Sequence, residues 1–145
     1  MKITLILILV SLALHATGQK QKVVFVCEHG VAKSVIATSF FNQLAAERGL
    51  NYEAVCRATA PDSAVSLSMR TGLASDNIPL NRSPQKLTAR DTVNTEVIVT
   101  FTSLPDNFGA GVPIEDWSSI QNLNGSYEQR KEVIIKKNKS LFGFT

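Results

Sequence analysis

The stretch Val23-Val24-Phe25-Val26-Cys27-Glu28-His29-Gly30-Val31-Ala32-Lys33-Ser34 decides the fold of this chain. Its first four residues form a continuous apolar run, which is typical of a strand buried on both faces of a parallel sheet. A turn that begins at Cys27 follows, and apolar residues at helical spacing come after it. The stretch therefore predicts a strand, a tight loop and the start of a helix.

The loop between this strand and helix is a predicted anion site. The first amides of a helix have no partner inside the helix, and the helix dipole is positive there. The five residues between Cys27 and Lys33 are enough to wrap an oxyanion with successive amides, and Gly30 is expected to take a positive φ. The same field favours a thiolate. The pattern therefore predicts a cysteine nucleophile directed at phosphate or a similar oxyanion.

The N-terminal residues 1–18 have the pattern of a secretory signal peptide. Lys2 precedes an apolar run over residues 3–14, and Ala16 and Gly18 give a small-x-small exit. The run is too short for an ordinary membrane span. We expect cleavage after Gly18, a periplasmic or secreted mature protein, and no membrane association after cleavage. A retained anchor or a strand of the fold is the alternative interpretation.

The remaining residues 19–145 suit a single domain with one core. A net charge of +3 is too small to indicate nucleic acid binding. Two cysteines are too few for a disulfide scaffold, and His29 is the one histidine beyond the signal peptide. An ordinary zinc site therefore lacks soft ligands, and we expect neither a metal nor a cofactor.

Strand-like and helix-like segments alternate along the chain, which implies βαβ units and a parallel sheet. Expected strands are residues 23–26, 52–58, 96–101 and 112–114. Expected helices are residues 33–49, 64–74, 83–89 and 126–142, with a turn at 122–125. The prediction is a three-layer α/β sandwich with a four-stranded parallel sheet and helices on both faces. Its site is expected at the carboxyl edge of the strands.

Several of these segments resemble the low-molecular-weight protein tyrosine phosphatase superfamily, which includes thioredoxin-coupled arsenate reductases. That family has a cysteine, five residues, an arginine, and then serine or threonine directly after the first strand. The match here runs from Cys27 to Ser34, with Lys33 in place of the arginine. Arg57-Ala58-Thr59-Ala60-Pro61, residues 72–88 and the strand 97–101 match later parts of the family pattern. The resemblance covers roughly residues 22–142.

The resemblance implies hydrolysis of a phosphate monoester, phosphotyrosine included, in a phosphorylated small molecule or protein. Cys27 is then the nucleophile, Ser34 hydrogen-bonds its thiolate, and Lys33 adds charge beside the bound oxyanion. The predicted oxyanion-binding residues are Glu28, His29, Gly30, Val31, Ala32 and Lys33. The Glu28 side chain is expected to point outward, because its charge is unfavourable at a phosphate site, and His29 either contacts the substrate or is an exposed loop residue. Arg57 either adds charge near this loop or pairs with an acid elsewhere.

Three departures from the family pattern bear on catalysis. Lys33 offers a point charge where arginine offers a planar fork to two phosphate oxygens. Gly30 stands where the phosphatases have an asparagine that shapes the loop. The chain has no Asp-Pro pair to carry the general acid, so Asp116 is a substitute candidate, with a solvated loop residue as the alternative.

Two other functions stay open. A non-catalytic oxyanion-binding or sensing domain agrees with the missing arginine and the missing Asp-Pro pair. A thiol redox or arsenate reductase-like role would use Cys27 and Cys56, although two cysteines do not support a three-cysteine relay. Cys56 is either a core thiol or the partner of Cys27 in a disulfide, which an oxidising compartment would favour.

Overall fold

The computed structural model describes residues 18–80, 82–120 and 126–143. The predicted signal peptide lies outside these residues except for Gly18. In chain order the elements are β1 (Gln21–Cys27), α1 (Lys33–Glu47), β2 (Tyr52–Ala58), α2 (Leu67–Ser75), the 3-10 helix η1 (Ala89–Thr92), β3 (Thr95–Thr100), β4 (Ile114–Asp116) and α3 (Tyr127–Leu141). Within the described ranges, no helix is both long and apolar enough to cross a membrane.

The four strands form one parallel sheet in the order β2-β1-β3-β4. β1 and β2 pair from Gln21 with Tyr52 to Cys27 with Ala58, so both strands end at the same edge. β3 pairs with the other side of β1, and the three-residue strand β4 extends the sheet beyond β3. The predicted α/β class with a four-stranded parallel sheet is confirmed, although β4 begins two residues later than expected.

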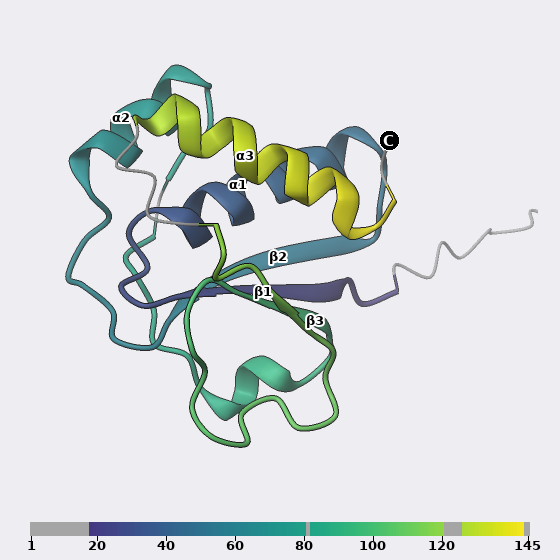
Figure 1. Cartoon of the computed structure of the whole chain (residues 1–145). Coiled ribbons are helices and arrows are strands. Elements are labelled where there is room, and N and C mark those ends of the chain that lie inside the picture. The colour runs from purple at the N-terminus through teal and green to yellow at the C-terminus, as the bar shows by residue number, and fades with distance from the viewer. Residues whose placement is uncertain (1–17, 81, 121–125, 144–145) are drawn as a thin grey trace, which may run out of the picture.

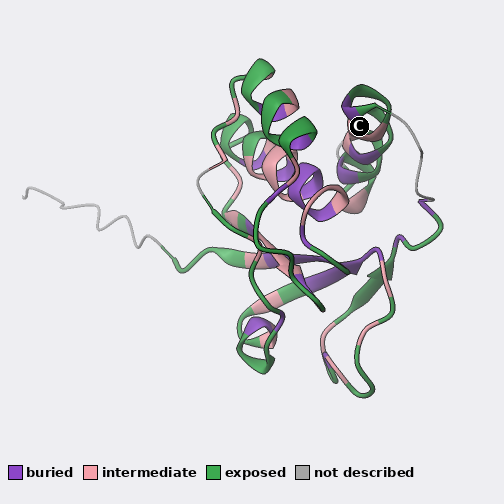
Figure 2. Cartoon of the chain, turned by 90° about the vertical axis from the view of Figure 1, so that its left-hand side faces the viewer, coloured by how far each residue is buried: buried purple, intermediate pink, exposed green. Residues whose placement is uncertain are grey.

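The two faces of the sheet are covered unequally. Helices α1, α2 and α3 pack on one face, where their core encloses Val23 and Phe25 (Figure 1). The opposite face carries Val24 and Val26, which pack against Leu87 and apolar residues of the 104–112 region, and among the described residues the short helix η1 lies on this side of the sheet (Figure 1). Figure 2 shows buried strand residues between these two layers. Burial on both faces explains the continuous apolar run of β1.

Helix α1 follows the loop that comes after β1. It begins at Lys33, as the apolar spacing predicts, and ends at Glu47, two residues before the predicted end. Gly49 follows with a φ of 63°, the left-handed conformation that glycine accepts at a helix end. Phe41 is 1% exposed and packs against Phe25 of β1, with ring centroids 5.9 Å apart. This packing fixes the start of α1 relative to the end of β1.

The helix predicted at residues 83–89 is wrong. The segment runs beside the outer edge of β2, where Lys86 forms a single parallel bridge with Ala58. The amide of Ala58 donates to the carbonyl of Gln85, and the amide of Leu87 donates to the carbonyl of Ala58, both at 2.8 Å. β2 is an edge strand whose outward backbone groups need partners, and this need outweighs the local helix-start signal of a Ser-Pro pair.

Helix α3 forms where it is predicted. The Ser126 hydroxyl accepts from the amide of the third helical residue, whose side chain in turn accepts from the Ser126 amide. Ile134 is completely buried, whereas the preceding Val133 is 38% exposed. Asn138 is buried instead and donates from Nδ2 to the Ala37 carbonyl at 3.0 Å. The turn predicted at 122–125 lies outside the described residues.

Candidate functional site

The carboxyl end of β1 and the amino end of α1 meet in a loop of residues 28–32, at the edge where the parallel strands end (Figure 1). Cys27 is the last residue of β1, and Lys33 is the first residue of α1. No side chain caps α1, and its first turn holds no acidic residue. The first amides of the helix are therefore open to a ligand.

The backbone of this loop is oriented for an anion. Three successive carbonyl groups are engaged from outside by amides of the segment after β2: those of Cys27, Glu28 and His29 accept from Thr59, Ala60 and Asp62 at 3.1, 2.8 and 3.1 Å. Among the described residues, no acceptor takes the amide hydrogens of His29, Val31 and Ala32. A loop with engaged carbonyls and open amides has donors left for a ligand, which an oxyanion requires.

The sulfur of Cys27 lies among hydrogen-bond donors. The amide of Gly30 donates to Cys27 Sγ at 3.1 Å, and Ser34 Oγ lies 2.6 Å from the same sulfur. Cys27 is 7% exposed and Ser34 is completely buried, so water competes little for these contacts. Cys27 and Ser34 thus lie together as predicted from the spacing.

Gly30 is required at its position for two reasons. Its φ of 70° is left-handed, as predicted. A Cβ at this position would also lie 3.0 Å from Pro84 Cβ and 3.1 Å from Ala58 Cβ. The sequence predicts the first reason but not the second, because Pro84 meets the loop only through the tertiary fold.

The ammonium of Lys33 lies on the side of the loop that faces the later strands. Nζ donates to the carbonyl of Ile120 at 3.3 Å and lies 5.7 Å from the centroid of the Phe101 ring. The side chain therefore joins the start of α1 to the segments that follow β3 and β4. A direct contact between Lys33 and a bound oxyanion, as the family pattern implies, stays a prediction.

Three ionisable side chains lie close together, two from the loop and one from the segment after β2. His29 Nδ1 lies 3.3 Å from Asp62 Oδ1, and His29 Nε2 lies 3.7 Å from Glu28 Oε2. All three side chains are at least half exposed. In the part of the chain that the structure describes, no group of three or more His, Cys, Asp or Glu side chains is placed to hold a metal ion. A contact between an oxyanion and Glu28 or His29 stays a prediction.

The guanidinium of Arg57 is bound away from the loop. Nε donates to Asp91 Oδ1 at 2.7 Å, and Nη1 donates to the Cys56 carbonyl at 2.8 Å. Asp91 is 5% exposed. Arg57 pairs in register with Val26, whose side chain packs on the sheet face opposite to that of Cys27. Of the two alternatives for Arg57, the structure shows the pairing with an acid and does not bring the guanidinium to the loop.

Asp116 ends β4 at the site edge of the sheet, but its carboxylate is already engaged. Oδ1 accepts from the Ser118 amide at 2.8 Å, and hydrogen bonds from Ser118 lower the pKa of Asp116. A general acid must carry a proton at the working pH, so this environment weakens Asp116 as an acid near neutrality. The adjacent Trp117 is 2% exposed and packs against Phe25, with ring centroids 5.9 Å apart.

Cys56 contacts the site through Ser34, which the sequence did not predict. Its sulfur lies 3.1 Å from Ser34 Oγ, and burial raises the pKa of the Cys56 thiol to about 12. Both cysteines are free thiols, so the structure contains no Cys27–Cys56 disulfide. The strand register could have suggested the contact. Since Cys27 pairs with Ala58, Cys56 lies two residues back on the same face of the sheet.

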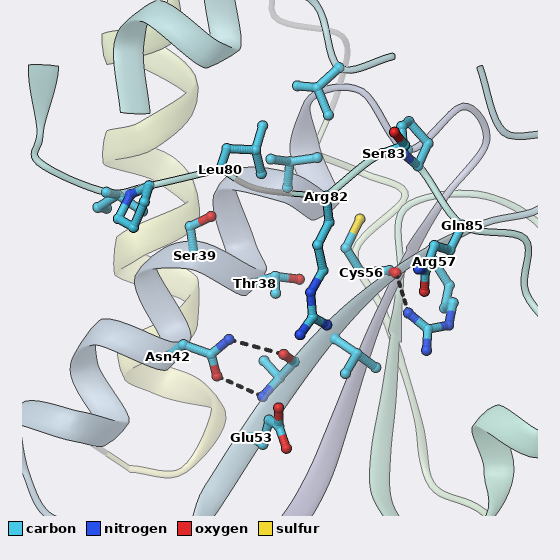
Figure 3. Close-up of a pocket in the computed structure, with 18 residues that line it drawn as sticks. Thr38, Ser39, Asn42, Glu53, Cys56, Arg57, Leu80, Arg82, Ser83 and Gln85 are labelled. Atoms are coloured by element: carbon cyan, nitrogen blue, oxygen red, sulfur yellow. Dashed lines mark hydrogen bonds between the residues drawn. The ribbon is translucent and has the colours of Figure 1, made fainter. Parts of the chain in front are cut away.

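A cavity of about 300 Å³ lies behind the loop, between α1, β2 and residues 78–85 (Figure 3). Gly30 and Cys56 line it, whereas Cys27 does not. Figure 3 shows Asn42 beside the outer edge of β2, where it accepts from the Ala54 amide at 2.7 Å and donates to the Ala54 carbonyl at 3.0 Å. The amide side chain thereby stands in for a neighbouring strand and closes part of this edge.

Several solved structures share this fold. A thioredoxin-dependent arsenate reductase of Corynebacterium glutamicum matches with a TM-score of 0.71 and 18% identity over 87% of this chain, which spans 62% of that protein. An arsenate reductase of Archaeoglobus fulgidus matches with a TM-score of 0.64 and 24% identity, over 83% of this chain and 98% of that one. The arginine phosphatase YwlE of Bacillus subtilis, solved as a mutant with a phosphorylated active-site serine, matches with a TM-score of 0.68 and 16% identity, over 83% of this chain and 95% of its own. At these identities the likeness establishes the fold alone.

Two further comparisons used the sequence in place of the structure. A search of curated proteins found no match. The model of the family described as low molecular weight phosphotyrosine protein phosphatase matches residues 22–107, more than half of the chain. The matched part contains the Cys27 loop and ends before Asp116. The chain therefore belongs to the low-molecular-weight phosphotyrosine protein phosphatase family.

Proposed function

We propose that this protein is an exported phosphomonoesterase that uses Cys27 as its nucleophile, with phosphotyrosine among its candidate substrates. The observation that supports the proposal most strongly is the loop geometry. The carbonyls of Cys27, Glu28 and His29 are engaged from outside, while the Gly30 amide and the Ser34 hydroxyl converge on the Cys27 sulfur. Export rests on the signal-peptide pattern of residues 1–18.

In the first step the Cys27 thiolate attacks the phosphorus of a bound monoester, in line with the leaving oxygen. The S–P bond forms while the P–O bond to the leaving group breaks, and the leaving oxygen takes up a proton. Negative charge on the three equatorial oxygens is stabilised by the open amides of the loop and by the first amides of α1. These donors are fixed before substrate binds, so little reorganisation is needed.

In the second step water attacks the phosphorus of the phosphocysteine. The S–P bond breaks, inorganic phosphate leaves, and the thiolate of Cys27 is restored. The Ser34 hydroxyl, 2.6 Å from the sulfur, stabilises the sulfur as nucleophile in the first step and as leaving group in the second. The two steps use the protein's own groups and need no added cofactor.

Proton transfer to the leaving group is the weak part of this site. Asp116 is the proposed acid, but the hydrogen bonds from Ser118 favour its charged form. A leaving group such as a nitrophenolate needs little protonation, whereas an alkoxide needs full protonation. We therefore expect hydrolysis of activated aryl phosphates and much slower hydrolysis of alkyl phosphates.

A non-catalytic oxyanion-binding or sensing domain is the second candidate. Lys33 is the cation at the position of the family's arginine. Its Nζ already donates to the Ile120 carbonyl, and this contact favours a domain that binds an anion without turnover. Such a domain would bind phosphate, sulfate or arsenate through the loop amides without turnover. An arsenate reductase relay has less support, since it would have to operate with Cys27 and Cys56 alone.

The proposal is tested with purified residues 19–145 and p-nitrophenyl phosphate under reducing conditions. Cys27→Ser is the control, because it removes the thiol and keeps a small polar side chain. Turnover above that control is the expected result. If the two proteins release nitrophenol equally slowly while calorimetry detects phosphate binding, the hydrolase proposal fails and the binding domain replaces it.

A further inference from the structure

Ser34 Oγ lies between two sulfur atoms, 2.6 Å from Cys27 Sγ and 3.1 Å from Cys56 Sγ. Ser34 is completely buried, so water does not supply a partner for its hydroxyl. The three side chains come from the end of β1, the first turn of α1 and the interior of β2. Among the described residues, Gly30 and Ser34 are the hydrogen-bond partners of the Cys27 sulfur.

The direction of these hydrogen bonds follows from the number of hydrogens available. A serine hydroxyl has one hydrogen to donate and can also accept. A thiolate at Cys27 can accept only, so the Ser34 hydrogen must point to Cys27 when the nucleophile is charged. Ser34 Oγ is then an acceptor toward Cys56, whose thiol has the hydrogen to give.

We propose that Cys56 is a positioning residue for the nucleophile: its S–H donates to Ser34 Oγ and thereby holds the Ser34 hydroxyl directed at the Cys27 thiolate. This deepens the proposed function and rests on it for its catalytic meaning. The order of donors is Cys56 S–H to Ser34 O–H to Cys27 S⁻. No covalent bond changes in this arrangement, and no proton leaves Cys56.

The buried environment of Cys56 supports this role. Burial raises the pKa of its thiol to about 12, so it keeps its hydrogen throughout the range in which Cys27 would work. Without this donor, the Ser34 hydroxyl loses the partner that occupies its acceptor site and is freer to rotate its hydrogen away from the Cys27 sulfur. Cys27 would then lose one of its two donors.

The test is the alkylation rate of Cys27 by iodoacetamide at pH 7, measured on freshly reduced protein by mass spectrometry of the Cys27 peptide. Cys56→Ala removes the donor and should slow alkylation about three- to tenfold, because the loss of thiolate exceeds the gain in nucleophilicity. Cys56→Ser keeps a donor and should stay within about twofold of the parent rate. Val65→Ala, which removes buried carbon atoms elsewhere in the same core, should leave the rate unchanged.

A double-mutant cycle separates positioning from packing. Because Cys56 acts through Ser34, Ser34→Ala combined with Cys56→Ala should react no more slowly than Ser34→Ala alone. The proposal is overturned if Cys56→Ala reacts at the parent rate, if Cys56→Ser is as slow as Cys56→Ala, if the two losses multiply, or if Val65→Ala slows alkylation equally. Alkylation needs no phosphate ester, so these outcomes are independent of whether the protein hydrolyses one.

Discussion

Replacing Gly30 by alanine tests whether Pro84 and Ala58 hold the loop in its shape. At a φ of 70°, an L side chain costs about 1–2 kcal/mol relative to glycine. The new Cβ would also lie 3.0 Å from Pro84 Cβ and 3.1 Å from Ala58 Cβ. Relieving such contacts in a packed region costs a further ~1–3 kcal/mol. We therefore expect Gly30→Ala to lower the free energy of unfolding by about 2–5 kcal/mol.

Gly49→Ala is the matched control for this measurement. Gly49 has nearly the same φ, 63°, but a Cβ there would meet no atom within 4 Å. It should show the backbone cost alone, about 1–2 kcal/mol. Urea denaturation followed by fluorescence of Trp117, the single tryptophan, measures both variants. Equal losses in the two variants would refute the argument that Pro84 and Ala58 hold the loop.

Gly30→Asn extends the same argument. Asparagine tolerates the left-handed conformation better than alanine does, but it still carries the Cβ that meets Pro84. We expect it to keep the packing loss and to recover part of the backbone cost. The asparagine of the family pattern would thus fit this position only if Pro84 and its neighbours moved.

Three further predictions concern the charged residues of the site. Lys33→Arg should raise kcat/KM for an aryl phosphate about tenfold or more, because a guanidinium can bind two oxygens at once. Lys33→Met is the uncharged control. A kcat/KM of Lys33→Arg equal to that of the parent protein would contradict this prediction. Asp116→Asn should lower kcat less than about tenfold at pH 7, against roughly 100-fold or more for a working general acid, because the lowered pKa of Asp116 leaves it unprotonated there. Its contribution should grow as the pH falls, and a pH–rate profile that is steepest near neutrality would refute this assignment. Arg57→Met should cost about 3 kcal/mol of stability by leaving Asp91 buried and unpaired, while phosphate binding measured by calorimetry stays unchanged; weaker binding at full stability would return Arg57 to the site.

The parts of the fold that the sequence predicted well are those with strong local signals. The apolar run of β1 and the helical spacing after Lys33 are short-range patterns, and each leads to one local structure. The segment at residues 83–89 failed because its local signal competes with a distant one. Its backbone is needed at the open edge of β2, beside Ala58, and no short-range pattern shows that need.

The same distinction applies to the candidate site. The contact between Cys27 and Ser34 lies within one motif and was predictable from spacing. The partners of Lys33 and Arg57 are Ile120 and Asp91, which lie 87 and 34 positions further along the chain. A residue's type and motif position indicate what it can bind, but tertiary structure decides which partner reaches it.

During turnover the loop should hold a phosphoryl group against the sulfur of Cys27. Rapid acid quenching of the reaction with p-nitrophenyl phosphate, followed by peptide mass spectrometry, detects that group. A transient phosphoryl group is expected on the peptide that contains Cys27, at the cysteine itself, and none is expected on that peptide in Cys27→Ala under the same conditions. Turnover without a phosphorylated Cys27, or with the phosphoryl group on another residue, would contradict it.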